Sequence, residues 1–96
     1  MTDASEVRDN AGASRYELQV DGHVAFLQYR DTPGGARVLV HTEVAAELEG
    51  RGIGGRLVKA ALEDAKAQNR RVVPSCPFVA SYIERHAEYK SLVALT

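Results

Sequence analysis

Residues 43–69, EVAAELEGRGIGGRLVKAALEDAKAQN, contain the pattern that decides the fold of this chain. Four glycines fall between positions 50 and 55, and they lead directly into a run with helical apolar spacing. The apolar stripe of that run consists of Ile53, Leu57, Ala61 and Ala65. This spacing predicts an amphipathic helix over residues 54–68, and Asn69 is placed to end it in a left-handed C-cap. A glycine-rich backbone at a helix start presents N–H groups at the positive end of the dipole, so we expect an anion site, most often for a phosphate.

The letters Gly50-x-Gly52-x-x-Gly55 also match the dinucleotide-binding fingerprint, but their surroundings do not fit it. That fingerprint needs a buried strand before the first glycine and an acidic residue roughly 20 positions later. Here Glu47-Leu48-Glu49 precedes the glycines, and Pro74-Ser75-Cys76 occupies the later position. No Lys-Ser or Lys-Thr pair follows the last glycine, which excludes a Walker loop. The remaining alternative is structural: the glycines would only permit close packing at the helix start.

The chain has 96 residues, which suffice for one domain with a single core. Residues 1–13 are polar, small and aperiodic, so we expect a flexible N-terminal tail there. Residues 14–96 are expected to form the single domain.

Composition excludes several classes of protein. A formal net charge of −1 argues against a nucleic-acid binder that works through bulk charge. No apolar run is long enough to cross a membrane and no signal peptide is visible, so we expect a cytoplasmic protein without a membrane partner. The single cysteine excludes an intramolecular disulfide, and no Cys/His cluster has zinc spacing. We therefore expect no bound metal.

The first half of the domain has the pattern of a β-meander. Residues 15–20 and 23–30 alternate as two strands, joined by the Asp21-Gly22 pair that suits a tight hairpin. A loop containing proline and glycine follows, and residues 36–42 then form a third strand. The three strands are expected to pair in antiparallel fashion.

The second half adds a parallel pair. Residues 70–74 predict a fourth strand after the central helix, and Pro77 fits the first turn of a second helix over residues 78–86. Phe78 and Tyr82 of this helix are expected to face inward. The order β-β-β-α-β-α predicts a compact α/β fold in which a right-handed crossover follows the meander. The glycine-rich loop at the start of the central helix and Cys76 then lie at one end of the sheet, where ligands favour the crevice.

Three pieces of sequence together resemble the small, single-domain members of the GCN5-related N-acetyltransferase (GNAT) superfamily. The pieces are His41-Thr42-Glu43-Val44, Glu49-Gly50-Arg51-Gly52-Ile53-Gly54-Gly55, and Pro74-Ser75-Cys76-Pro77-Phe78-Val79 with the following Tyr82 and His86-x-x-Tyr89. The resemblance extends over residues 16–93.

The resemblance implies acetyl-coenzyme A as cosubstrate and an amine-bearing acceptor that the sequence does not identify. In the superfamily, the motif Q/R-x-x-G-x-G/A binds the coenzyme pyrophosphate through backbone amides at the start of the central helix. Glu49 stands at the Gln/Arg position of that motif. The implied coenzyme-binding residues are Val44, Gly50, Arg51, Gly52, Ile53, Gly54, Gly55, Arg56 and Cys76.

Acetyl transfer to an amine needs a proton acceptor, a polarised thioester carbonyl and a proton for the leaving thiolate. His41 could accept the amine proton because histidine titrates near neutral pH. Glu43 is a second candidate and lies two residues away on an extended chain, so both side chains should point to the same side. Tyr82 is a candidate donor to the thiolate. The alternatives are a solvent-exposed strand end for His41 and Glu43 and a core position for Tyr82.

Cys76 has two functional interpretations. It could carry the acetyl group covalently, or its thiol could lie beside the coenzyme as a proton donor; the structural alternative is a small buried residue. No neighbour in sequence lowers its pKa, so we expect direct transfer in a ternary complex. The rival function is a coenzyme A-binding or interaction module without useful catalysis.

Overall fold

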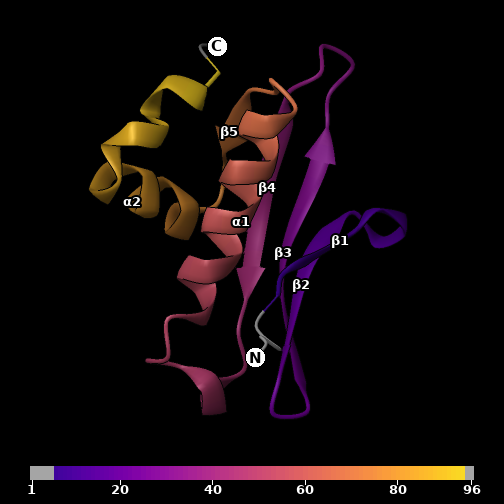
Figure 1. The fold of residues 1–96 in the computed structure, drawn as a ribbon, viewed down its shortest axis with the longest axis vertical. Coiled ribbons are helices and arrows are strands. Elements are labelled where there is room, and N and C mark those ends of the chain that lie inside the picture. The colour runs from indigo at the N-terminus through magenta and orange to yellow at the C-terminus, as the bar shows by residue number, and fades with distance from the viewer. Residues whose placement is uncertain (1–5, 95–96) are drawn as a thin grey trace.

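The computed structural model describes residues 6–94 and contains one five-stranded sheet in the order β1-β2-β3-β4-β5 (Figure 1). Neighbouring strands from β1 to β4 are antiparallel, whereas β4 and β5 are parallel. The strands are β1 (Arg8–Asn10), β2 (Arg15–Val20), β3 (His23–Asp31), β4 (Arg37–Glu43) and β5 (Val72–Pro74). The predicted meander and parallel crossover pair are confirmed, and β1 is an additional strand.

β1 corrects the prediction of a tail over residues 1–13. Arg8–Asn10 pairs with β2, and the short 3-10 helix η1 (Ala11–Ala13) turns the chain into that strand. The predicted tail is therefore wrong for residues 8–13, while residues 1–5 and 95–96 lie outside the described part of the chain. All three β1 residues are exposed, so the strand carries no apolar alternation that could reveal it.

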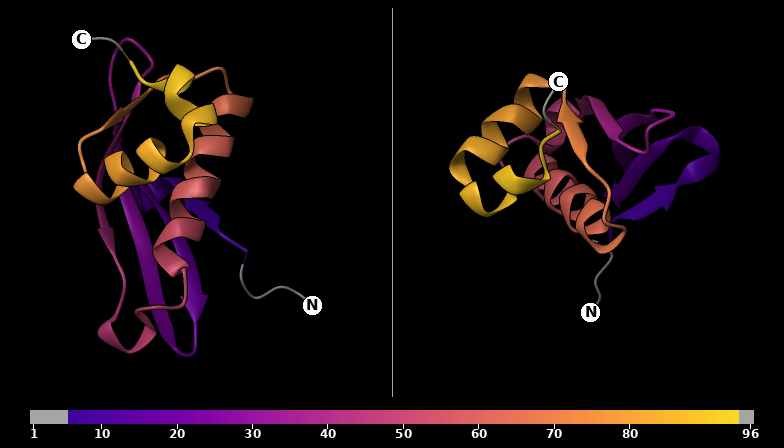
Figure 2. Two further views of the ribbon diagram at one scale, coloured as in Figure 1. Left: turned by 90° about the vertical axis from the view of Figure 1, so that its left-hand side faces the viewer. Right: turned by 90° about the horizontal axis from the view of Figure 1, so that it is seen from above.

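Two α-helices and two further 3-10 helices complete the described part of the fold. The helices are η2 (Ala46–Leu48), α1 (Ile53–Ala67), α2 (Pro77–Arg85) and η3 (Ala87–Leu92). α1 lies along one face of the sheet, and α2 and η3 lie beside α1 (Figures 1 and 2). Asn69 has a φ of 55°, which confirms the predicted left-handed end of the central helix. Within residues 6–94, no helix combines the length and apolar character that crossing a membrane requires.

The outer edge of β5 is covered by the end of the described chain. Val93 forms an isolated parallel bridge with Val72, and the N–H of Ala94 donates to the Val72 carbonyl at 2.8 Å. Val72 is fully buried as a result of its packing between this segment and the core. The segment after α2 therefore packs back on the sheet.

The core lies between the sheet and α1. Alternate residues of the strands and one stripe of α1 are buried against each other. The buried residues include Leu18, Ala25, Leu27 and Leu39 from the sheet and Leu57, Val58, Ala61 and Leu62 from α1. These are the faces that the alternation of apolar residues in the strands and their helical spacing in α1 predict.

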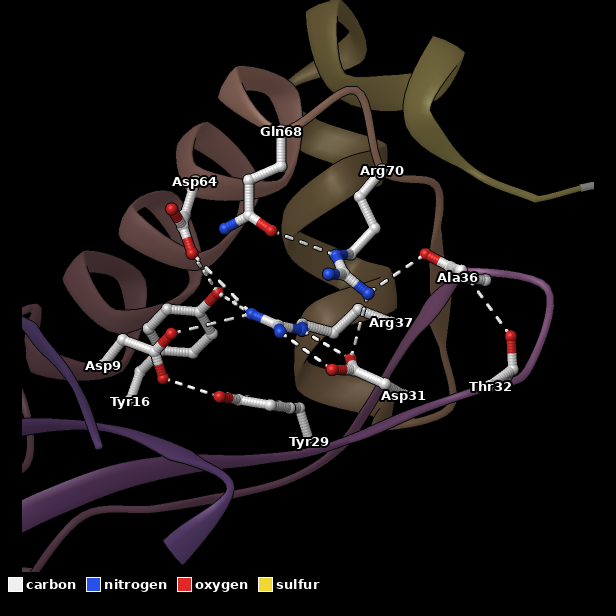
Figure 3. A network of polar contacts seen from close by, with 11 residues as sticks. Asp9, Tyr16, Tyr29, Asp31, Thr32, Ala36, Arg37, Asp64, Gln68 and Arg70 are labelled. Carbon is white, nitrogen blue, oxygen red and sulfur yellow. Dashed lines mark hydrogen bonds and ion pairs between the residues drawn. The ribbon is translucent and has the colours of Figure 1, made fainter. Parts of the chain in front are cut away.

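At the end of the sheet near the α1 C-terminus, the interior is polar and centred on Arg37 (Figure 3). Arg37 is 6% exposed and forms a bidentate pair with Asp31, with Nε–Oδ1 and Nη2–Oδ2 distances of 2.7 and 2.9 Å. Its Nη1 donates to the Tyr16 hydroxyl at 2.8 Å, and that hydroxyl donates to Asp64 of α1 at 2.7 Å. A cation inside a protein is tolerated when its donors are paired in this way.

The same network holds β1. The Tyr29 hydroxyl donates to Asp9 at 2.6 Å, and Arg37 Nη1 lies 3.8 Å from the second oxygen of Asp9. The Arg37 guanidinium also lies over the Tyr29 ring, 3.8 Å from its centroid. Burial and the bond to Asp9 raise the pKa of Tyr29 to about 12, so this hydroxyl remains a donor at neutral pH.

Replacing Arg37 with methionine should lower the free energy of unfolding by about 2–4 kcal/mol, because Asp31 and the Tyr16 hydroxyl lose a shared partner. The carboxylates are partly exposed and can regain water, which keeps the loss below that of a fully buried pair. Urea denaturation at pH 7 measures the change. Arg30→Met, at an exposed position of β3, is the control and should stay within about 0.5 kcal/mol of the original chain. Equal losses in the two variants would contradict the role of Arg37.

The network also gives the stability a pH dependence. Hydrogen bonds from Arg37 hold the pKa of Asp31 below its ordinary value. The stabilisation is therefore complete above the unfolded-state pKa of about 3.9 and is lost as pH falls through the lower folded-state value. In Asp31→Asn, the decline of unfolding free energy from about pH 5 downward should be shallower. An unchanged slope would show that Asp31 does not carry this dependence.

Candidate functional site

β4 separates from β5 halfway along its length. Their pairing ends at Leu39 and Pro74, and the Cys76 N–H donates to the Leu39 carbonyl at 3.0 Å. Pro74 has no N–H with which to continue a ladder, and the chain turns into α2 at Pro77. Within the described residues, the second half of β4 has no strand beside it on this side. An opening results between β4 and the starts of the two helices.

A β-bulge decides which side chains of β4 face this opening. The register shifts by one residue, so that Val40 has no partner in β3. Simple alternation from the buried Leu39 would put His41 on the side of α1. Because of the extra residue, Thr42 takes that side and pairs with the core residue Leu27, whereas His41 faces away.

The loop between β4 and α1 is anchored at two points. Leu48 of η2 is buried in the core. Arg51 forms a 2.7 Å ion pair with Asp21 in the β2–β3 turn. Between and beside these anchors, Gly50 and Gly52 have φ angles of 84° and 74°, and a Cβ on either would meet no atom within 4 Å. These two glycines are therefore required by backbone conformation, not by packing.

α1 begins at Ile53, with Gly52 as its N-cap residue. The Arg56 N–H donates to the Gly52 carbonyl at 3.1 Å and is the first helical bond. Helix geometry leaves the preceding N–H groups, of Ile53, Gly54 and Gly55, without a carbonyl partner inside the helix. Such a helix start favours a negative charge.

A pocket of about 370 Å³ lies at this helix start. It is in the size range of small-molecule sites, roughly 300–1,000 Å³. Its walls come from the end of β4, the glycine loop, the first turn of α1 and the first turn of α2. The lining residues are Thr42, Val44, Leu48, Glu49, Gly50, Gly52, Ile53, Gly54, Gly55 and Phe78. Of the nine coenzyme-binding residues expected from sequence, six line this pocket.

The other three expected residues lie around the pocket. Arg51 points to the hairpin turn, where it pairs with Asp21. Arg56 is exposed on the first turn of α1. Cys76 is 5% exposed and borders the pocket through Thr42, whose Oγ1 lies 3.6 Å from the Cys76 Sγ.

The environment of Cys76 differs from the sequence expectation that nothing lowers its pKa. Burial of the thiol raises the pKa, but the amide of Val79, the hydroxyl of Thr42 and the amides of Phe78 and Thr42 outweigh it. The pKa of Cys76 therefore lies below its ordinary value. Position Cys76 is the N-cap of α2, where amides at the helix start favour a thiolate.

His41 and Glu43 form a pair on the other face of the sheet. His41 Nε2 lies 2.7 Å from Glu43 Oε1, and the two side chains are 55% and 59% exposed. They point to the same side, as predicted. Neither lines the pocket, because the bulge places both side chains on the face of the sheet opposite to that of Thr42. The structure thus brings His41 and Glu43 together but not into contact with the glycine loop.

Tyr82 lies between the helices instead of in the pocket. Its ring stacks on His86 with a centroid distance of 4.0 Å and contacts the Cα side of Gly55, where a Cβ would lie 3.6 Å from Tyr82 Cε2. Burial, and then the nearby Glu88 carboxylate, raise the pKa of Tyr82. Its position is that of a core residue joining α1, α2 and η3.

Thr42 and Phe78 are pocket residues that the sequence did not single out as functional. Thr42 lies between two titratable residues, His41 and Glu43, which are more usual candidates for catalysis. Only the bulge places its side chain on the pocket side of the sheet. Phe78 was expected to face the core as an apolar helix residue, but it is 41% exposed and lies in the pocket wall. The one sequence signal for a pocket position was that Phe78 lies in the first turn of a helix that follows a strand end.

The pocket could bind a ligand that has an anionic group at one end and an apolar segment beside it. Helix-start amides supply donors for negative oxygens, and Val44, Ile53 and Phe78 supply apolar walls. In residues 6–94, His, Cys, Asp and Glu side chains form no group of three that could hold a metal ion.

Comparison with known proteins agrees with this geometry. A family model described as GCN5-related N-acetyl-transferase matches residues 15–92. The solution NMR structure of a GCN5-like protein from Staphylococcus aureus matches with a TM-score of 0.74 and 26% sequence identity, covering 99% of this chain and 93% of that one. A search of curated proteins found no match. The match over most of the chain shows that this protein belongs to the GCN5-related N-acetyltransferase family.

Proposed function

We propose that the protein transfers the acetyl group of acetyl-coenzyme A to an amine, by direct transfer in a ternary complex. The observation that carries this proposal is the pocket at the start of α1, where the glycine backbone and the first amides of the helix, which have no carbonyl partner inside it, meet the opening beside β4. A pyrophosphate bound there would accept hydrogen bonds from residues 50–56. The coenzyme supplies the activated acetyl group.

The chain's own residues would divide the remaining tasks between the two faces of the sheet. Thr42 and Cys76 border the pocket and could donate to the thioester oxygen or the leaving sulfur. His41 and Glu43 would receive the acceptor's proton from the exposed face, beside the half of β4 that β5 does not cover. If His41 Nε2–H donates to Glu43, its Nδ1 is the free proton acceptor.

A second candidate function is supported by one specific observation. None of His41, Glu43 and Tyr82 lines the pocket, so the chain could be a coenzyme A-binding module without efficient turnover. Equilibrium binding of acetyl-coenzyme A combined with turnover on a panel of primary amines separates the two. Binding with turnover supports the enzyme, binding alone supports the module, and absence of binding removes both.

Gly52→Ala should weaken coenzyme A binding at least tenfold, about 1.4 kcal/mol, because an alanine resists the positive φ that orients the loop amides. Gly35→Ala is the matched control: Gly35 also has a positive φ and open space for a Cβ, but it lies in the β3–β4 loop. Both variants should lose similar unfolding free energy. Only Gly52→Ala should change the affinity measured by calorimetry, and equal affinity in both would contradict the loop's role.

His41→Ala should lower kcat/KM for the amine about 100-fold if His41 is the general base. Glu43→Gln should cost less, since it removes only the partner of the imidazole. His23→Ala, a histidine at the start of β3, is the control and should leave kcat/KM unchanged. Near-normal activity in both His41→Ala and Glu43→Gln would exclude the pair from proton transfer.

Cys76→Ala should retain measurable transfer, because in a ternary complex the thiol only donates or shapes the pocket. An acyl carrier would instead be acetylated by acetyl-coenzyme A alone, with release of free coenzyme A. Its lowered pKa makes this alternative chemically open, whereas its 5% exposure opposes it. Intact-protein mass spectrometry distinguishes them. A kinetically competent adduct on Cys76 that the amine discharges would replace direct transfer by a two-step route.

A further inference from the structure

Gly54 and Phe78 fit against each other at the pocket. A Cβ built on Gly54 would lie 2.8 Å from Phe78 Cζ, closer than real Cβ atoms approach a neighbour, and 3.0 Å from Cε2. The outer end of the Phe78 ring therefore occupies the space in which any other residue at position 54 would place its side chain. This contact joins the first turn of α1 to the first turn of α2.

The reason for a glycine differs between Gly54 and the two glycines of the loop. Gly50 and Gly52 have positive φ angles and open space around them, whereas Gly54 lies within α1. Alanine is the better helix former, so the helix itself gives no reason for glycine at this position. The adjacent Gly55 shows that space is the deciding factor, since a Cβ there would make an ordinary 3.6 Å contact with Tyr82.

Phe78 is not held in place by the core. α2 contributes Val79, Tyr82 and Ile83 to the buried cluster, while the Phe78 side chain is exposed and lines the pocket. The Phe78 ring is exposed, and the glycine at position 54 of α1 leaves space for it. This combination indicates that the ring has a role in the pocket wall that it forms. Since phenylalanine offers no hydrogen-bond donor, the ligand segment against this wall should be uncharged and apolar.

We propose that Phe78 is a positioning residue that sets the width of the pocket at the first turn of α1, and that position 54 is a glycine to seat this ring. The proposal rests on the proposed function, because it takes the coenzyme to bind in this pocket. It assigns Gly54 to the pocket wall and leaves phosphate binding to the backbone amides.

The experiment compares Gly54→Ala, Phe78→Leu and the double variant, with Gly34→Ala as the control. Gly34 lies in the β3–β4 loop outside the pocket, and a Cβ there would make an ordinary 3.9 Å contact with Thr32 Oγ1. The clash in Gly54→Ala involves the far end of an exposed ring, which can swing aside, so the chain should fold. Displacing the ring should raise the calorimetric Kd for coenzyme A about tenfold. The KM for acetyl-coenzyme A should rise similarly, with kcat within about twofold. Gly34→Ala should leave all three values unchanged.

The double variant decides the assignment. Leucine keeps an apolar wall but ends short of the Cζ and Cε positions, so Gly54→Ala should have less than about a threefold effect on Kd in the Phe78→Leu background. A tenfold effect in both backgrounds would overturn the proposal, because the glycine would then serve the ligand directly. Unchanged Kd in Gly54→Ala would overturn it as well.

Two measurements on the original chain keep the outcomes distinct. An NMR contact between the Phe78 ring and the Gly54 α-protons in the free protein is expected, and its absence would overturn the seating of the ring regardless of any ligand. If the original chain does not bind coenzyme A, both the proposed function and this inference are wrong. If the original chain binds and the two substitutions act additively, only this inference fails.

Discussion

Among residues 6–94, one buried cation holds the end of the sheet and α1 together. The guanidinium of Arg37 reaches Asp31 in β3, the Tyr16 hydroxyl in β2, and the Asp9 and Asp64 carboxylates in β1 and α1. A 96-residue chain can build only a small apolar core, and here a polar cluster completes it at one end. The cluster contacts α1 near its C-terminal end, at Asp64, whereas the pocket lies at the opposite end, at the first turn of the helix.

β4 links the two ends of the molecule. Its first residue carries the buried guanidinium, its middle pairs with β5, and its second half, after the bulge at Val40, borders the pocket. The bulge and Pro74 act together: one changes the facing of the side chains, and the other ends the hydrogen-bond ladder. The opening between β4 and β5 therefore arises from two local features of the backbone, the bulge at Val40 and the end of the ladder at Pro74.

Features that arise from local periodicity could be predicted from the sequence. The central helix, its left-handed end at Asn69, and the hairpin at Asp21-Gly22 follow from apolar spacing and turn chemistry, and the structure contains all three. β1 could not be found in this way, because its residues are exposed and contacts distant in sequence hold it. The glycine cluster was expected to lie at a binding crevice because it stands directly before a helix start, and Gly50 and Gly52 do line the pocket.

The candidate site was predicted less completely, for physical reasons. Alternation correctly gives His41 and Glu43 a common side, but a one-residue bulge determines which side that is. The reduced pKa of Cys76 comes from the start of α2 and from Thr42, which is 34 positions away. Likewise, an apolar pattern in α2 cannot distinguish Phe78, which forms a pocket wall, from Val79, which is fully buried.

The bridge between Val72 and Val93 has a practical consequence for handling the protein. β5 is only three residues long, and the segment ending at Ala94 satisfies the Val72 carbonyl on its outer side. A shortened chain that stops before Val93 would leave this carbonyl and the apolar strand edge open to another molecule. We expect such truncations to self-associate, because an open strand edge can pair with another chain. A purification tag placed on this side is therefore better attached through a spacer, so that Val93 and Ala94 can still cover the edge of β5.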